Sequence, residues 1–538
     1  MSGVREQVTS VIASGDPRID AILHNQRWLD GAITYSAPAD LGAYEPGYGG
    51  GENQGFLPAS PLMRAALTRL LDADSGNRVH AGFAVEGFTA LDVTPGRERD
   101  ASVRLAQTAA DPYDFGTAWA YFPGTFTTSG DIWTHNGRLD YTGPLPGNYA
   151  HHTLVHELGH TLGLVHGHEG TAFGTLPADY DSMEYTVMTY RSHVGAASGQ
   201  YTNETNGYAQ GFMMLDIAAL QYLYGANFEV NSDDTVYSWY PYKGATLVDG
   251  TIAFTAAGNR IFATIWDGGG QDTYDLSAYS TPVVIDLAPG GHSVFDTAQL
   301  ARLGEDTLAR GNIFNALQYQ DDPRSLIENA IGGDGADEIT GNAADNRLEG
   351  RAQDDRLDGA AGADLALGQL GNDMLYGGGG ADRLIGGHGN DWLSGGSDGD
   401  VLLGGAGDDR LFGRKGDDEL KGGMGDDIID GGKGRDRLSG NDGDDHFLFR
   451  TAEDSGPGPD ADLIRDFEQG QDLIDLSQLG AMLSFMGNGA LLAGSASLAY
   501  QHDGALTRVL LDLDGDLAAE MQIDMTGLID LTEADFIL

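Results

Sequence analysis

Three histidines and one glutamate lie in a short stretch of this chain, at spacings that suit a metal centre. His156 and His160 would lie on one face of a helix, with Glu157 beside them. Gly163 can take a backbone conformation that other residues disfavour, so the chain can leave the helix there and bring back His166. The pattern predicts a zinc ion bound by His156, His160 and His166, with a fourth position open for water.

A zinc ion held by three neutral imidazoles keeps its full charge. It would lower the pKa of a bound water toward roughly 7 and polarise a peptide carbonyl. Glu157 would accept the proton of that water and later pass it to the leaving amine, so the predicted chemistry is peptide hydrolysis. An ordinary helix can also carry two histidines around a glutamate without any metal, but the glycine and the third histidine argue against that interpretation.

Downstream, the segment Tyr185–Tyr190 contains a methionine followed two residues later by a tyrosine. This resembles the methionine turn beneath the zinc ion of metzincin proteases. With the histidine cluster, it makes the chain similar to the serralysins, which are secreted bacterial metzincins. The resemblance implies that Met188 forms a hydrophobic floor under the histidines. It also implies that Tyr190 is a further zinc ligand that can swing away to stabilise the oxyanion. Elsewhere these would be a core methionine and a strand tyrosine.

Three further histidines lie close to this cluster. His151 and His152 precede the predicted ligands, and His168 follows them. Their spacing assigns them no role in metal binding. We interpret them as exposed residues, or as residues that support the ligands from behind.

The composition excludes two classes of partner. The 538 residues include 81 acidic and 30 basic side chains, a formal net charge of -51, so nucleic acid and anionic membranes are unfavourable partners. A solvated acidic surface or an adaptation to high salt would also give this charge, but many aspartates recur at fixed intervals. There is no cysteine, and no segment approaches the ~20 apolar residues of a membrane span.

From Gly332 to Leu448 the sequence repeats with a period of nine, in about thirteen units. This is the glycine- and aspartate-rich nonapeptide of RTX proteins, which stacks into a parallel β-roll with calcium between its turns. The sixth-position carboxylates are the predicted calcium ligands: Asp373, Asp382, Asp391, Asp400, Asp409, Asp418, Asp427 and Asp436. The eighth-position aliphatic residues are the predicted core: Leu375, Leu384, Leu393, Leu402, Leu411, Leu420, Ile429 and Leu438.

The early repeats depart from this pattern. Asn346 replaces an aspartate, Gly341 and Gly350 lack a second glycine, and Ala366 stands where a large aliphatic residue belongs, so we expect weaker or no calcium binding there. A flexible glycine-rich linker would not keep an aliphatic residue at a fixed phase. Without calcium the tract has little apolar surface and many like charges, so we expect it to fold only outside the cell.

The sequence predicts an α+β metzincin catalytic domain, followed by an all-β calcium-bound parallel β-roll and a C-terminal β-sandwich. Asp216–Asn227 has helical spacing with a glycine stop, as in the last helix of a serralysin catalytic domain. The predicted segments are an N-terminal segment and candidate propeptide (1–17), the zinc protease domain (18–230), a β-rich bridge (231–331), the RTX roll (332–448) and a C-terminal β domain with a secretion signal (449–538).

Two other acidic groups leave alternatives open. Asp267 and Asp272 flank a run of glycines and predict either a calcium site or a plain turn. The segment Asp512–Asp516 is similar to a calcium loop, but it lacks the downstream glutamate of an EF-hand. There we expect a hairpin turn.

Met1–Pro17 lacks an apolar core of signal-peptide length, so export by the general secretory route is unsupported. The chain ends in Asp535–Leu538, an acidic residue followed by apolar ones, as serralysin secretion signals do. We expect a monomeric zinc endopeptidase that acts on proteins or peptides, is exported by type I secretion machinery and remains extracellular or attached to the cell surface. Two alternatives stay open: a calcium-dependent adhesion protein with an inactive protease fold, and a processing protease for one surface protein.

Overall fold

The chain forms two compact units in the computed structural model. The structure describes residues 7–29, 31–44, 48, 51–76, 78–110, 117–137 and 139–538. The first unit comprises Met1–Asp275 and Leu287–Ile327, and the second comprises Leu276–Asp286 and Glu328–Leu538. The expectation of a candidate propeptide falls partly outside the described residues, because residues 1–6 are not among them.

The described α-helices belong to the first unit. They are α1 (Pro17–Asp20), α2 (Pro61–Leu71), α3 (Val85–Phe88), α4 (Tyr149–Leu162) and α5 (Met214–Tyr224). Helices α4 and α5 are largely buried in the core of this unit. In α4, the side chain of Asn148 caps the first turn by accepting the N–H of His151. The helix ends at Gly163, whose φ of 101° is the left-handed conformation expected from the sequence. Within the described residues, no helix is long and apolar enough to cross a membrane.

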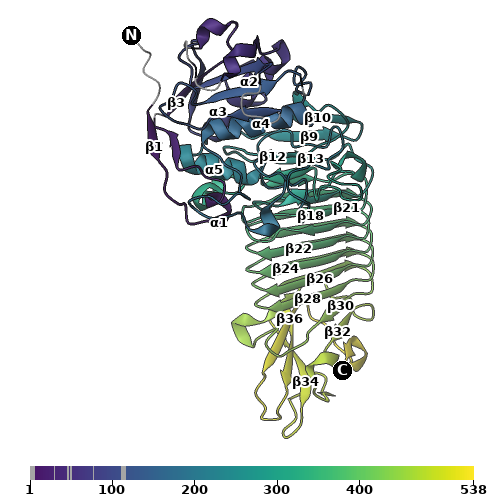
Figure 1. The fold of residues 1–538 in the computed structure, drawn as a ribbon. Coiled ribbons are helices and arrows are strands. Elements are labelled where there is room, and N and C mark those ends of the chain that lie inside the picture. Colours follow the sequence, from purple (N-terminus) through teal and green to yellow (C-terminus); the bar gives the residue numbers. More distant parts are fainter. Residues whose placement is uncertain are drawn as a thin grey trace. The chain divides into compact units, whose positions relative to one another are not determined.

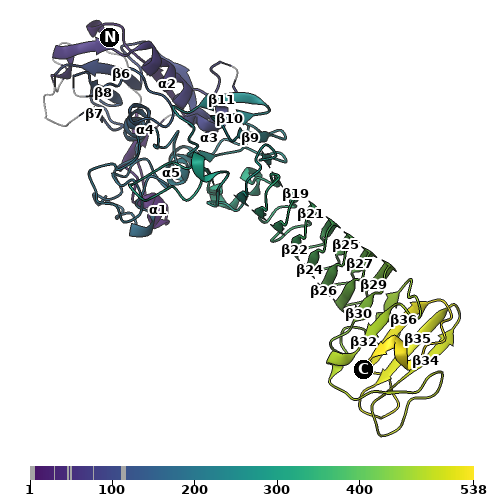
Figure 2. The same cartoon turned by 90° about the vertical axis from the view of Figure 1, so that its right-hand side faces the viewer.

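A sheet with the strand order β5-β3-β6-β8-β7 lies beside α4, which packs against β7 and β8 (Figures 1 and 2). The strands of the first unit are β1 (Val8–Ser10), β2 (Gln26–Trp28), β3 (Ala32–Ser36), β4 (Phe56–Pro58), β5 (Asp92–Pro95), β6 (Val103–Thr108), β7 (Ala118–Ala120), β8 (Asp131–His135), β9 (Val236–Tyr240), β10 (Lys243–Val248), β11 (Thr251–Thr255), β12 (Ala263–Ile265), β13 (Thr273–Asp275), β15 (His292–Ser293) and β16 (Ile313–Asn315). Strand β7 runs antiparallel to β8, at the end of the sheet nearest α4.

The described residues near the N-terminus pair with other segments of the first unit. Strand β1 pairs antiparallel with β2. The N–H of His24 then donates to the carbonyl of Gly163 at 2.8 Å, and the N–H of Val165 donates to the carbonyl of Ile22 at 2.9 Å. Residues 22–24 therefore pair with the turn that leads from α4 to His166.

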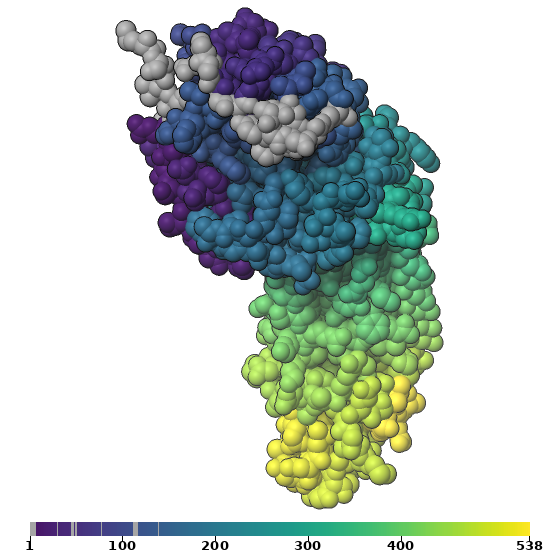
Figure 3. Space-filling view, viewed as in Figure 1, coloured from purple at the N-terminus to yellow at the C-terminus, as the bar shows by residue number. Residues whose placement is uncertain are grey.

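The second unit is a roll of two parallel sheets, and successive repeats add strands to them alternately. One ladder runs β17-β19-β21-β23-β25-β27-β29-β31, and the other runs β14-β18-β20-β22-β24-β26-β28-β30-β32-β37. Residues 18 apart pair in register, such as Leu384 with Leu402, and every predicted eighth-position core residue is 0% exposed. The stacked turns make up the green part of the surface in Figure 3.

The strands of the second unit are short and evenly spaced. They are β14 (Val284–Asp286), β17 (Asn329–Ile331), β18 (Glu338–Thr340), β19 (Arg347–Ala352), β20 (Arg356–Asp358), β21 (Leu365–Leu370), β22 (Met374–Gly379), β23 (Arg383–His388), β24 (Trp392–Ser397), β25 (Val401–Ala406), β26 (Arg410–Lys415), β27 (Glu419–Met424), β28 (Ile428–Lys433), β29 (Arg437–Asp442), β30 (His446–Leu448), β31 (Asp462–Ile464), β32 (Leu473–Asp475), β33 (Ser484–Phe485), β34 (Ser497–Asp503), β35 (Leu506–Asp512), β36 (Met521–Thr526) and β37 (Phe536–Ile537).

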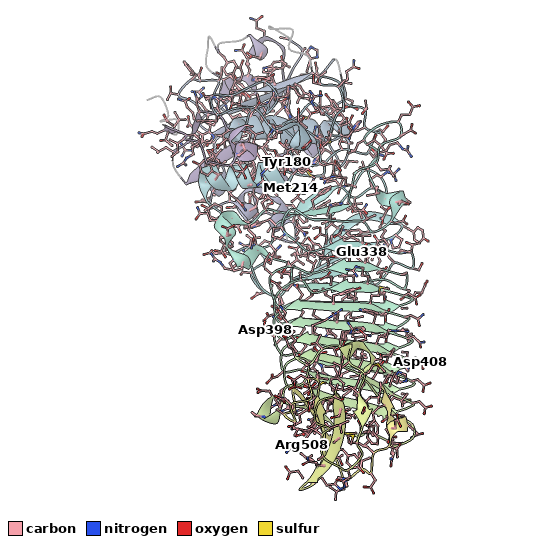
Figure 4. The ribbon with its side chains drawn as sticks, turned by 90° about the horizontal axis from the view of Figure 1, so that it is seen from below. Tyr180, Met214, Glu338, Asp398, Asp408 and Arg508 are labelled. Carbon is pink, nitrogen blue, oxygen red and sulfur yellow. The ribbon has the colours of Figure 1, made fainter. Side chains whose placement is uncertain are left out.

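Because alternate repeats enter different sheets, their turns fall on opposite edges of the roll. Figure 4 shows this for Asp398 and Asp408, which belong to successive turns and lie at opposite edges of the strand ladder. At the C-terminal end, β36 pairs parallel with β31, and β35 and β34 follow it as antiparallel strands. Strand β37 extends the other ladder in parallel. The C-terminal strands thus continue both sheets of the roll.

Candidate functional site

The structure brings together the three histidines that the sequence singled out. The Nε2 atom of His166 lies 3.0 Å from Nε2 of His156 and 3.0 Å from Nε2 of His160. His156 and His160 come from successive turns of α4, and His166 comes from the chain that returns after Gly163. Three ring nitrogens from two segments therefore converge on one point.

The other ring nitrogen of each histidine already has a partner. Nδ1 of His156 donates to the carbonyl of Val187 at 2.7 Å, and Nδ1 of His160 donates to the carbonyl of Leu164 at 2.8 Å. Nδ1 of His166 lies 3.1 Å from Oε1 of Glu169. With the protons on Nδ1, all three Nε2 atoms present lone pairs to one another, which is unfavourable unless a cation lies between them. This donor set fits a zinc ion.

Burial also favours the neutral, metal-binding form of these imidazoles. It lowers the pKa of His156 to about 4 and that of His166 to about 3, and it holds the pKa of His160 well below its usual value. Glu157 lies between the two helical histidines in sequence. Burial raises the pKa of its carboxyl to about 8, because it removes water from the charged form.

Met188 and Tyr190 lie against this cluster. Met188 is 0% exposed, and a Cβ on Gly159 would come within 2.6 Å of its Sδ atom, so the methionine packs against α4 between the two helical histidines. The ring of Tyr190 stacks on His156 at 5.5 Å and lies 4.4 Å from His166. The zinc-binding and catalytic roles of these residues remain predictions.

Two cavities meet at Glu157 and Tyr190. One, of about 520 Å³, runs along β7 past His160 and is walled in part by residues 23–25. The other, of about 620 Å³, begins at Thr117 and Ala118 and extends over the first turn of α4. An extended peptide could lie along β7 with one side chain in each cavity.

Sequence reasoning missed the residues that hold the site from behind. Asp216, at the start of α5, accepts the N–H of Val187 at 2.8 Å and also binds the hydroxyl of Thr186. The carboxylate of Asp216 thereby fixes the turn whose carbonyl orients His156. In the sequence, Asp216 shows only the pattern of a helix cap. That pattern does not reveal which distant residue its carboxylate binds. The nearby His151 and His152 are each 1% exposed, which excludes the first of the two alternatives, exposed residues, and leaves the second, residues that support the ligands.

The eight predicted calcium ligands of the roll share one environment. Each lies at most 2% exposed, and its Oδ1 accepts the N–H of the residue 18 positions earlier at 2.7–2.9 Å. Its Oδ2 is buried and has no hydrogen-bond partner. A Cβ on Gly377 would lie 2.2 Å from Oδ2 of Asp382 and 2.6 Å from the carbonyl of Gly395, so oxygen atoms face the same small space. This arrangement fits calcium, a hard cation that prefers oxygen.

Among the described residues of the second unit, four further aspartates share the buried, unpartnered Oδ2 and were not among the predicted ligands: Asp355, Asp364, Asp445 and Asp462. The first three follow the nine-residue period and could have been found by extending it. Asp462 lies outside the period, and only the fold places it at the end of a ladder.

Asn346 replaces the carboxylate with an amide, and the structure shows the consequence. Its Nδ2 donates to the carbonyl of Glu328 at 2.9 Å and to Oδ1 of Asn342 at 3.2 Å. An N–H donor therefore occupies the place where the other repeats present a bare oxygen, which agrees with the expected loss of calcium there.

The two remaining acidic groups are partnered within the protein. Asp267 accepts the hydroxyl of Tyr237 at 2.7 Å and the N–H of Gly269 at 2.9 Å. The hairpin expected at Asp512–Asp516 is present between β35 and β36. It also brings carboxylate oxygens of Asp512, Asp514, Asp516 and Glu520 within 4.8 Å of one another. Glu520 is not at the EF-hand position, which Ile523 occupies.

These features define a protein whose second unit is a parallel β-roll. Residues 226–538 match the family model described as Peptidase M10 serralysin C terminal, and the chain belongs to this family.

Curated relatives agree with this assignment over part of the chain. A serralysin of Proteus mirabilis is 34% identical over 44% of this chain and 46% of its own length, and serralysin G of Dickeya chrysanthemi is 34% identical over 43% and 44%. The metallopeptidase AprA of Pseudomonas marginalis is 33% identical over 43% and 46%. The chain therefore spans less than half the length of these relatives.

Among solved structures, a subunit of the mannuronan C5-epimerase of Azotobacter vinelandii is 32% identical, with 27% of this chain and 88% of that chain covered. The TM-score is 0.20, so this likeness is too weak to describe the fold.

Proposed function

We propose that this protein is a secreted zinc-dependent endopeptidase whose roll binds calcium. The observation that carries the proposal is the convergence of three buried Nε2 atoms at 3.0 Å, each on a ring whose Nδ1 is already engaged. Such a site is unfavourable without a cation, and a catalytic metal needs an open side. The two cavities that meet at Glu157 and Tyr190 supply it.

In this proposal His156, His160 and His166 hold the zinc, which supplies Lewis acidity toward a water and a peptide carbonyl. Glu157 takes a proton from the attacking water and later gives it to the leaving nitrogen. The substrate lies along β7, where backbone hydrogen bonds can hold it as an added strand. The hydroxyl of Tyr190 donates to the carbonyl oxygen as negative charge develops on it.

Calcium is proposed to fold the roll. Leaving the buried Oδ2 atoms of the predicted aspartates without a partner costs free energy. The folded roll therefore needs cations or protons at these positions. Low calcium inside the cell would keep the roll unfolded and competent for a type I secretion channel, and extracellular calcium would fold it. The C-terminal Phe536–Ile537 pairs with β32 in the folded state, so a signal there would be readable only before folding.

The test is metal analysis together with casein hydrolysis on the full chain. We expect about one zinc and several calcium ions per chain, and hydrolysis that is lost on treatment with a zinc-selective chelator and restored by zinc. Glu157→Gln should bind zinc but lose hydrolysis. A protein that binds calcium and no zinc, and that hydrolyses nothing after zinc is added, would favour the adhesion alternative.

A further inference from the structure

The larger of the two cavities lies beside the proposed reaction centre. It has a volume of about 620 Å³ and shares His156, Glu157 and Tyr190 with that centre. Its remaining wall includes the rings of Tyr149, Tyr201 and Tyr208. A substrate side chain next to the bond being cleaved can therefore enter it.

His152 lines this cavity and has an unusual environment. It is 1% exposed, and neither of its ring nitrogens has a hydrogen-bond partner. The rings of Tyr201 and Tyr208 lie 5.1 Å and 5.4 Å from it and shield it from water. A buried imidazole without any partner costs free energy, and no described residue forms a hydrogen bond with this one.

Neighbouring histidines show that the fold can satisfy buried imidazoles in this region. Nε2 of His151 pairs with the carbonyl of Gln210 at 3.1 Å, and His156 and His160 each have a carbonyl partner at Nδ1. Nδ1 of His151 also lacks a partner, so among these described histidines His152 alone has neither ring nitrogen engaged. An imidazole without a hydrogen-bond partner in the free protein can form its hydrogen bond with a substrate side chain instead.

The chemistry of the cavity limits what can bind there. The buried imidazole of His152, in its neutral form, offers one donor and one acceptor. Among the described lining residues, Glu157 is the only carboxylate and there is no lysine or arginine. An anionic side chain would lose its hydration without gaining a counter-charge, and a cationic one could pair only with Glu157, the proposed base. A fully apolar side chain would leave His152 unpaired. An uncharged side chain with an apolar body and a polar end satisfies both limits.

We propose that His152 is a specificity-determining residue, which selects substrates carrying tyrosine or glutamine next to the cleaved bond by hydrogen-bonding the polar end of that side chain. The proposal rests on the proposed peptidase function. Since Tyr201 and Tyr208 cover the ring in the free protein, the entering side chain reaches it by displacing one of their rings.

The test is the cleavage profile of a peptide library with the zinc-loaded full chain and its variants. Wild type should prefer tyrosine over phenylalanine, and glutamine over leucine, by roughly tenfold or more at one position beside the cleaved bond. His152→Phe should remove or reverse this preference, while His152→Gln should keep it, because its amide also offers a donor and an acceptor. The matched control is His24→Phe in the other cavity, which should leave the preference at this position unchanged.

Thermal stability separates this role from a purely structural one. His152→Phe should raise the melting temperature by about 2–4 °C, because it removes an unsatisfied polar group. If phenylalanine is too large for the space, His152→Leu should show the same increase. Both variants melting lower than wild type would overturn the proposal. So would a wild-type profile without a polar preference, or the same preference in His152→Phe. If wild type cleaves no peptide at all, the proposed function itself fails, and the role of His152 falls with it.

Discussion

His156 and Val187 are joined by a hydrogen bond of 2.7 Å, in which the ring Nδ1 donates to the backbone carbonyl. The N–H of the same valine donates to Asp216 on α5 at 2.8 Å. The carboxylate of Asp216 on α5 thus orients the imidazole of His156 on α4 through the N–H and the carbonyl of one residue, Val187. Partners of this kind fix the tautomer and direction of a ligand, and their loss weakens metal binding.

Asp216→Asn should therefore lower the affinity for zinc by about 10- to 100-fold. The amide would present N–H groups toward backbone N–H donors, so the turn that carries Val187 would shift. Competition with a chromogenic zinc chelator measures the affinity. Thr186→Val is the matched control, because it removes a hydroxyl that binds the same carboxylate and accepts the N–H of Met188, but it leaves the bond between Asp216 and Val187 in place. Equal zinc affinity in Asp216→Asn and wild type would contradict this positioning role.

Tyr190→Phe tests the proposed oxyanion role. The ring stacks on His156 and borders both cavities, so phenylalanine should keep the packing and remove only the hydroxyl. We expect kcat on a peptide substrate to fall by about 100-fold with little change in KM, since the hydroxyl acts mainly as charge develops on the oxygen. Zinc content measured on the same samples is the control. An unchanged kcat would remove Tyr190 from the mechanism.

Asp391→Ala together with Asp409→Ala should lower the melting temperature in calcium by about 5 °C or more and change little when calcium is removed. Both carboxylates present a buried, unpartnered Oδ2, which is the atom a calcium ion would engage. The control is Asn390→Ala with Asp408→Ala, the exposed neighbours in the same turns. Equal losses with and without calcium would refute the ligand assignment.

Asn346→Asp should add one calcium ion per chain. The amide that donates to the carbonyl of Glu328 would become a carboxylate facing that carbonyl, so the position would resemble the other repeats. Elemental analysis gives the stoichiometry, and Asn390→Asp, at an exposed position, should leave it unchanged. An unchanged count in Asn346→Asp would mean that neighbouring residues, rather than the amide, prevent binding.

The sequence alone predicted those features that depend on the spacing of residues close together in the chain. The left-handed turn at Gly163 and the buried phase of Leu384 and Leu402 follow from residue types at fixed intervals. Features set by tertiary contacts could not be read in this way. Nothing near Asp216 in sequence shows that it meets Val187, and nothing near His152 shows that its ring lacks a partner. Asp462 lies 26 residues from Asp436, whose N–H it accepts, so no repeat period could reveal it.

The calcium-free roll should become more stable as the pH falls from 8 to 5. Burial, together with neighbouring carboxylates, raises the pKa of Asp355 and Asp427 to about 8 and that of Asp462 to about 9, against a value near 3.9 in the unfolded chain. Between pH 5 and pH 8 the folded state binds more protons than the unfolded state, so the free energy of unfolding falls as the pH rises.

Calcium competes with the same protons, and its binding midpoint should therefore move to higher calcium concentration at pH 5. Thermal melts after removal of calcium on a chelating resin, and calcium titrations followed by circular dichroism, measure the two effects. A calcium-free protein that melts higher at pH 8 than at pH 5 would show that these carboxylates are ionised without calcium and that the roll tolerates their repulsion.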